Sequence, residues 1–308
     1  RIDVNDPTDL PIERSSEFAV RAEHLGFTGV GMPDHPSNGQ DVFVRLALAA
    51  KATTQVTLFP SVTNPVSRNP KSLASLGCTL ANLAPGRARL VVASGQAALK
   101  FVGKPRLSVA ETAHAVSSIR AALAGEVKPP APVPVYVNAS SPRMLEVAGS
   151  TADGVYPVVG VDPEIVDIAL GWVQSGLALS QRTFEDFDVA YGLPIFMADS
   201  REEALDSALG YALMNLLNRN RVFSRVLRQR MPSLAAVSAV TDLTTDQARR
   251  MADAMVIYGT PPEVAGSLVE FAEAHPTWHF ITRVEMVDRD PFEALENFAA
   301  ALNAVSNR

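Results

Sequence analysis

Several residue types that usually mark a particular class of protein are scarce in this sequence. It has one cysteine, Cys78, so no disulfide can form within the chain, and its five histidines lack the spacing of a metal site. It has no apolar run long enough to cross a membrane and no signal-peptide pattern. We therefore expect a soluble, cytoplasmic protein without a metal, in which the thiol is buried and structural.

Excess positive charge is also lacking. The net charge of −6 argues against attraction to nucleic acid or to an anionic membrane. Hydrophobic residues make up 47% of the chain, which is enough for a large core. The length of 308 residues suits one α/β barrel, which usually needs about 250 residues. No Gly-rich or Ser-rich linker divides the chain, so we predict a single domain over residues 1–308.

Short apolar stretches alternate with segments of helical periodicity along the whole chain. Strands are predicted at 2–4, 28–32, 56–59, 87–93, 133–137, 154–159, 187–196 and 279–284. Helices are predicted at 12–25, 42–52, 70–83, 109–124, 143–148, 163–179, 201–228, 245–256, 262–274 and 291–305. This alternation is typical of a parallel sheet covered by helices. We therefore predict an α/β fold, a (β/α)8 TIM barrel, with a doubly wound open sheet as the alternative.

Polar segments follow several of the predicted strands directly. They are Asp34-His35, Ser61 to Asn64, Ser94-Gly95-Gln96 and Ser140-Ser141. Ligands of a parallel barrel bind where the strands end, so these segments would converge on one face. No Gly-rich dinucleotide fingerprint, P-loop or Schiff-base lysine accompanies them.

One of these strands and its polar end lie in the stretch Gln55 to Pro70, QVTLFPSVTNPVSRNP. An apolar strand leads into hydroxyls and a carboxamide, and two X-Pro steps then end any regular pattern. Such an irregular strand end can serve as a ligand platform. An ordinary loop, with Pro70 in the first turn of the next helix, is the alternative.

The segment NASSPR at 138–143 is a second possible ligand site. Hydroxyls, free backbone N–H groups and Arg143 at the start of a helix can hold a phosphate. The simpler alternative is that Ser140 or Ser141 caps the helix and Pro142 takes its first position. Asp34-His35 likewise can polarise or protonate a ligand, or can only cap and pack against a loop.

Five arginines lie close together near the end of the predicted helix 201–228. They are Arg219, Arg221, Arg225, Arg228 and Arg230. We predict that they form a solvated basic face, with an anion contact or a dimer surface as alternatives.

Five stretches of the chain occur together, in this order, in a known superfamily. They are AEHLGFTGVGMPDH (22–35), SVTNPVSRNP (61–70), LANLAPGRARLVVASG (80–95), VPVYVNASSPRMLEVAGSTADGV (133–155) and YGTPPEVA (258–265). The set resembles the luciferase-like monooxygenase superfamily. Within it, the chain is most similar to the short branch typified by methylenetetrahydromethanopterin reductase, which uses the deazaflavin coenzyme F420.

The resemblance implies a (β/α)8 barrel with the cofactor at the strand C-termini, and a homodimer. It also implies a non-proline cis peptide at Ser61-Val62 and an acid on the first strand, loosely matched by Asp3. Together with the interpretation of Asp34-His35 given above, we predict Asp34 and His35 as the catalytic residues. The implied cofactor-binding residues are Ser61, Val62, Thr63, Asn64, Ser94, Gly95, Ala139, Ser140, Ser141 and Arg143.

Some positions depart from the pattern of the reductases. Ala93 and Gln96 stand where a glycine and an acid are usual, Ser141 replaces a glycine, and segment 125–133 is shorter than in many relatives. That segment shapes the substrate entrance, so no substrate is carried over. We interpret the chain as an oxidoreductase that moves a hydride between F420 and a small organic substrate. The alternatives are a flavin mononucleotide (FMN) monooxygenase and a barrel without catalysis.

Overall fold

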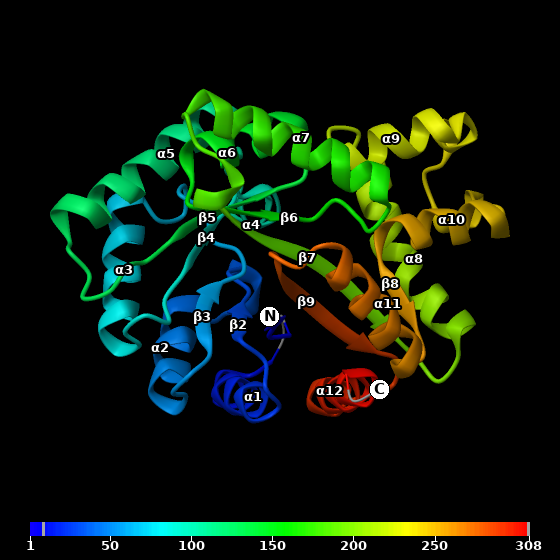
Figure 1. Cartoon of the computed structure of the whole chain (residues 1–308), viewed down its shortest axis with the longest axis horizontal. Coiled ribbons are helices and arrows are strands. Elements are labelled where there is room, and N and C mark those ends of the chain that lie inside the picture. Colours follow the sequence, from blue (N-terminus) through cyan, green and yellow to red (C-terminus); the bar gives the residue numbers. More distant parts are fainter. Residues whose placement is uncertain (8–9, 307–308) are drawn as a thin grey trace.

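The computed structural model describes residues 1–7 and 10–306, in which parallel strands form a barrel enclosed by helices (Figure 1). The strands are β1 Ile2–Asn5, β2 Gly29–Met32, β3 Thr57–Pro60, β4 Leu90–Val92, β5 Val135–Ala139, β6 Gly154–Pro157, β7 Asp188–Met197, β8 Ile257–Gly259 and β9 His279–Met286. Their hydrogen-bonded order is β3-β2-β1-β9-β7-β6-β5-β4, and β8 pairs with the C-terminal part of β7. The predicted barrel is confirmed, and the open-sheet alternative is wrong.

Helices cover the outside of this barrel. They are α1 Ile12–His24, α2 Val42–Ala52, α3 Pro70–Leu83, α4 Gln96–Phe101, α5 Val109–Ala121, α6 Pro142–Thr151, α7 Pro163–Leu179, α8 Arg201–Leu217, α9 Val222–Arg230, α10 Thr245–Met255, α11 Pro261–Ala274 and α12 Pro291–Ser306. The last helix, α12, packs against α1, so the two ends of the chain meet on one side of the barrel (Figure 1).

The barrel closes between β3 and β4 through isolated bridges rather than a regular ladder. The backbone N–H of Thr63 donates to the Val91 carbonyl at 3.0 Å, and the N–H of Ala93 donates to the Thr63 carbonyl at 2.9 Å. Pro60, at the end of β3, has no N–H to offer a ladder. The seam therefore lies beside the irregular strand end that the sequence singled out.

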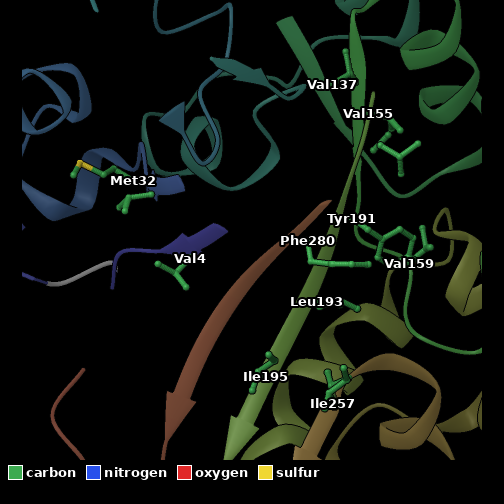
Figure 2. Packing of buried hydrophobic residues seen from close by; sticks show 14 of the residues in the cluster. Val4, Met32, Val137, Val155, Val159, Tyr191, Leu193, Ile195, Ile257 and Phe280 are labelled. Atoms are coloured by element: carbon green, nitrogen blue, oxygen red, sulfur yellow. The ribbon is translucent and has the colours of Figure 1, made fainter. Parts of the chain in front are cut away.

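Side chains alternate between the two faces of the barrel wall, as the pleat of a strand requires. The inward-facing cluster consists of Phe59, Val91, Tyr136, Tyr156, Ala190 and Ile281. Their neighbours along the same strands, such as Val137, Val155 and Phe280, point outward into the layer between strands and helices (Figure 2). That outer layer is the main hydrophobic core.

Two predicted boundaries are corrected by the structure. The helix expected at 201–228 is broken into α8 and α9, because the Asn218 side chain accepts from the Asn220 N–H and so competes with the helical hydrogen bonds. The helix expected to end at Gly125 continues as a π-helical turn, Ala122–Glu126. Two elements, α4 and β8, were not predicted, because they are too short to show a clear periodicity.

A polar cluster fills the N-terminal end of the barrel. Arg89 pairs with Asp3 at 2.9 Å, and its guanidinium lies 4.9 Å from the ring centres of Phe59 and Tyr136. His279 is 1% exposed and lies 3.6 Å from Asp188, which also accepts from the Tyr136 hydroxyl. Asp3 is thus paired with Arg89 at the N-terminal end of the barrel and is not among the residues that line the cavity described below, so its match to an acid of the reductases stays a prediction.

Two expectations drawn from the composition, on the cysteine and on membrane spans, can be compared with the structure. Cys78 is half-buried and its thiol donates to the Val127 carbonyl at 3.3 Å, so it is less buried than predicted. Within residues 1–7 and 10–306, no helix combines the length and the apolarity needed to cross a bilayer.

Asp188 makes stability depend on pH. Burial would raise the pKa of this carboxyl, but the adjacent His279 ring and Tyr136 hydroxyl outweigh burial and hold the pKa well below its ordinary value. The charged form therefore adds stability that is fully present above the unfolded pKa, about 4, and is progressively lost as pH falls toward the lower folded pKa. We expect Asp188→Asn to be less stable than wild type at pH 7, and the difference to shrink toward pH 3.

Urea unfolding across that pH range measures the difference. A difference in the free energy of unfolding that stays constant with pH would contradict a contribution from the Asp188 charge.

Candidate functional site

A cavity of about 370 Å³ opens at the C-terminal ends of β2, β3, β4 and β5. Its lining includes Pro33, Asp34, His35, Ser61, Val62, Thr63, Asn64, Ala93, Ser94, Gly95, Ala98, Arg106, Asn138, Ala139, Ser140, Ser141, Met144, Asn218, Asn220 and Arg221. All the predicted site residues except Arg143 are in this set. Arg143 instead lines a hollow that adjoins the cavity.

The floor of the cavity contains the cis peptide bond Ser61-Val62, which confirms that expectation. The Ser61 side chain hydrogen-bonds Tyr156, whose hydroxyl also accepts from the Asn5 side chain at 3.3 Å. Burial raises the pKa of Tyr156 to about 12, so its hydroxyl stays protonated at neutral pH. The bulge after β3 is thus anchored to the barrel interior.

Asp34 is held by two neighbours. It accepts a hydrogen bond from the Thr63 hydroxyl at 2.6 Å and pairs with Arg68 at 2.5 Å. Arg68 also pairs with Asp41 at 2.6 Å. Burial would raise the pKa of Asp41, but Arg68 outweighs burial and lowers it. Both contacts of Asp34 are with neighbouring loop residues, and its catalytic role stays a prediction.

His35 has one ring nitrogen free for a ligand. Its Nδ1 accepts from the Ser37 N–H at 3.3 Å and lies 2.6 Å from the Ser37 hydroxyl. In the neutral ring the proton is therefore on Nε2, for which no partner is found among the described residues. The ring lies 5.9 Å from that of Phe101, an exposed residue at the end of α4. His35, which lines the cavity, can thus donate a hydrogen bond to a ligand there.

The start of α6 has no side-chain cap. Ser141 occupies the cap position, but its side chain makes no capping hydrogen bond, and the Met144 N–H donates to the Ser141 carbonyl instead. Pro142 takes the first helical position as predicted, whereas side-chain capping by Ser141 is wrong. An uncapped helix N-terminus attracts an anion.

A second helix begins at the same place. The N–H of Val222 donates to the Ser140 carbonyl at 2.9 Å, which brings the start of α9 against that of α6. Arg221, at the cap position of α9, lines the cavity and donates to the Asn215 side chain. Its buried Nε has no hydrogen-bond partner, and no carboxylate among the described residues pairs with it. Burial lowers the pKa of Arg221, although an arginine stays charged at neutral pH.

The predicted solvated arginine face is therefore wrong for Arg221. Arg228 is also tied down, since it donates to the carbonyls of Leu216 and Leu234. The anion-contact alternative fits Arg221, which sequence reasoning did not include in the site. The sequence shows Arg221 as one of a run of arginines. Only the break between α8 and α9, however, places the Arg221 side chain at the cavity.

Gly95 allows the loop after β4 to pass close to the cavity. Its φ of +85° lies in the left-handed region that favours glycine. A Cβ at this position would lie 2.6 Å from Leu99 and 3.0 Å from Asn64. Asn64 is itself 2% exposed, and its side-chain oxygen accepts from the N–H groups of Val66 and Ser67. The polar tip of the β3 loop is thus packed directly against Gly95.

No group of three or more possible metal ligands occurs in the part of the chain that the structure describes. Among the described residues, the cavity combines apolar side chains with neutral donors and two arginines, Arg106 and Arg221, that form no ion pair. Such a site is suited to a flat, partly apolar ligand that carries an anionic group.

Comparison with known proteins identifies the family. The model of the family described as luciferase-like monooxygenase matches residues 1–277. The chain belongs to the luciferase-like monooxygenase family.

Two similar proteins with known names are a reductase and a dehydrogenase. A 5,10-methylenetetrahydromethanopterin reductase from Methanolobus tindarius is 31% identical over 202 residues, which are 60% of this chain and 61% of that protein. An F420-dependent glucose-6-phosphate dehydrogenase from Kineococcus radiotolerans is 26% identical over 92% of this chain and 90% of that protein. The match to the reductase thus spans less than two thirds of its length.

Solved structures show the same luciferase-like fold. The coenzyme F420 dependent tetrahydromethanopterin reductase from Methanopyrus kandleri has a TM-score of 0.77 at 19% identity, covering 99% of this chain and 98% of that one. An F420-dependent secondary alcohol dehydrogenase, in complex with an F420-acetone adduct, has a TM-score of 0.78 at 17% identity with the same coverage. The monooxygenase RslO1 from Streptomyces bottropensis has a TM-score of 0.68 at 20% identity, covering 99% of each chain.

Gly95 and Gly26 form a matched pair for a stability test. Gly26 has nearly the same φ, +88°, but a Cβ there would meet nothing within 4 Å. We expect Gly26→Ala to cost about 1 kcal/mol for the left-handed backbone alone, and Gly95→Ala to cost roughly 1–3 kcal/mol more because of crowding. Denaturant unfolding measures both. Equal losses for the two variants would contradict the close contact between Gly95, Leu99 and Asn64.

Proposed function

We propose that this protein transfers a hydride between coenzyme F420 and a small organic substrate. The observation that carries the proposal is the cavity at the strand C-termini, where an apolar floor lies next to an uncapped helix start and an unpaired arginine. The F420-dependent relatives named above support the choice of cofactor.

The described residues fit a deazaflavin ring. Val62, Ala93 and Ala98 offer apolar surface, and a Cβ at Gly95 would crowd the Asn64 loop beside the cavity. The deazaflavin supplies a carbon that accepts or gives the hydride, so the protein needs mainly to hold ring and substrate face to face.

The described residues also fit the phosphate of the cofactor. Ser140 and Ser141 precede α6, whose first backbone N–H groups are not capped by a side chain, and Arg221 lies against the same turn. Helix N-termini and arginine are the usual partners of a phosphate. We assign Arg221 to the phosphate together with the predicted Ala139 to Ser141 backbone.

His35 and Asp34 take different roles in this proposal. The free Nε2–H of His35 donates to the substrate oxygen or nitrogen whose charge changes as the hydride moves. Asp34 is a positioning residue, because its carboxylate receives the Thr63 hydroxyl and the Arg68 guanidinium rather than facing the cavity unpaired.

A binding titration of the purified protein with F420 and with FMN, followed by fluorescence, tests the cofactor. We expect micromolar binding of F420 and much weaker binding of FMN. Binding of FMN alone, with oxygen consumption by the reduced flavin, would favour the monooxygenase alternative. Binding of neither would favour a barrel without catalysis.

His35→Asn tests the role of His35 as a hydrogen-bond donor to the substrate. We expect kcat to fall by about 10²-fold or more while the dissociation constant for F420 changes little, because the histidine acts on the substrate rather than on cofactor binding. The exposed histidine His114, on the outer side of α5, is the matched control, and His114→Asn should leave kcat unchanged. An unaltered kcat in His35→Asn would remove His35 from the mechanism.

The homodimer is also proposed rather than observed, and rests on the resemblance stated above. The cytoplasmic location likewise stays a prediction. Sedimentation of the purified chain would show whether it forms a homodimer.

A further inference from the structure

A separate hollow lies in the helix layer around β8, and it shares no lining residue with the strand-end cavity. Its volume is about 440 Å³, compared with about 370 Å³ for the cavity. The starts of α7 and α8, the end of α10, the strand β8 and the second half of α11 form its walls. We call it the α7–α11 hollow.

The backbone around β8 explains why the hollow exists. β8 has three residues and, among the described strands, pairs with the C-terminal part of β7 alone. A strand this short gives the helices beside it little length to pack against. The loop after β6 is fixed next to the hollow, because the Val161 N–H donates to the Ala254 carbonyl at 2.9 Å. The hollow therefore follows from the course of the backbone.

Apolar and aromatic side chains form the inner part of the hollow. Val166 and Ile257 are buried, and Phe271 is half-buried. The Phe271 ring lies 4.8 Å from that of His275, which in turn stacks on Trp278 at 3.8 Å with an interplanar angle of 2°. This wall is suited to the apolar body of a ligand.

The aromatic wall carries no charge at neutral pH. Burial lowers the pKa of His275 below its ordinary value, although the charge of Asp167 acts in the opposite direction. The ring is therefore neutral at pH 7 and does not balance the carboxylates of the hollow.

The charges that line the hollow do not balance either. Arg201 is already shared by two carboxylates, since it lies 3.7 Å from Asp253 and 4.0 Å from Glu263. Asp167 of α7 and Glu270 of α11 also line the hollow, and within residues 1–7 and 10–306 neither forms an ion pair or a hydrogen bond through its side chain. Two carboxylates from different helices thus have no cationic partner in the protein.

This combination of groups favours one class of ligand. A carboxylate attracts an ammonium group, and the face of an aromatic ring adds to that attraction. An inorganic cation would leave the apolar wall unused, and the described residues contain no group of three or more metal ligands. A cation with an apolar body satisfies both parts of the hollow.

We propose that the α7–α11 hollow binds a small organic amine. Its ammonium group lies near Asp167 and Glu270, and its apolar or aromatic body lies against Phe271 and Ile257. The hollow is separate from the strand-end cavity, so this inference goes beyond the proposed function and does not depend on it.

Two probes of nearly the same shape test the proposal, 2-phenylethylamine, which is a cation at pH 7, and 2-phenylethanol, which is neutral. Calorimetric titration of the full chain measures the dissociation constant of each. We expect a dissociation constant of about 1 mM or below for the amine, as its small size allows. The alcohol should bind about tenfold more weakly, because two exposed carboxylates and a ring face each add a few-fold.

The variant Asp167→Asn/Glu270→Gln should bring the amine to the affinity of the alcohol, because it removes the charge and keeps the shape of both side chains. The matched control Glu13→Gln/Glu273→Gln removes the same charge from exposed positions of α1 and α11 outside the hollow and should keep the tenfold preference.

Three results would overturn the proposal. They are no binding of the amine by wild type up to about 10 mM, equal affinities of wild type for amine and alcohol, and an unchanged preference in the Asp167→Asn/Glu270→Gln variant. None of them bears on the binding of F420 in the strand-end cavity, which the titration described above tests separately.

Discussion

Thr63 makes the contacts on which the site depends. It is fully buried, and its backbone joins the ends of β3 and β4 through hydrogen bonds to Val91 and Ala93. Its hydroxyl donates to Asp34 in the loop after β2. One residue thus closes the barrel and fixes three of the loops that surround the cavity. Because the seam here has no regular ladder, the position of these loops depends on such side-chain contacts.

The two ends of the barrel use charge differently. At the N-terminal end, the Arg89 guanidinium is paired with Asp3 and lies near two aromatic rings, so its hydrogen-bonding capacity serves stability. At the C-terminal end, the buried Nε of Arg221 has no hydrogen-bond partner among the described residues, and no side chain caps the start of α6. An unpaired buried donor costs free energy. Its presence at the ligand-binding end of a barrel is therefore the physical basis for assigning an anion to this place.

Most of the fold and of the inner cavity could be predicted from the sequence. Strands and helices of ordinary length show their periodicity locally, and the polar segments directly after β2, β3, β4 and β5 had to meet once the strands were parallel. The break between α8 and α9 could not be predicted in the same way, because it depends on whether the Asn218 side chain outcompetes a helical hydrogen bond. Short elements such as β8 form only because a neighbouring strand, β7, presents an unpaired edge to them.

The sequence by itself determined the order of the elements, the family, and which loops surround the ligand, because these follow from local patterns and from the geometry of parallel strands. Only the tertiary structure decided which charged groups are free. Asp34 is held by Arg68, 34 positions away, and Arg230 by Asp162, 68 positions away. Arg221 and Arg225, in contrast, pair with no carboxylate in the part of the chain that the structure describes. Ion pairs between residues far apart in the chain leave no local signal, so the chemistry of each arginine became clear only when its neighbours in space were known.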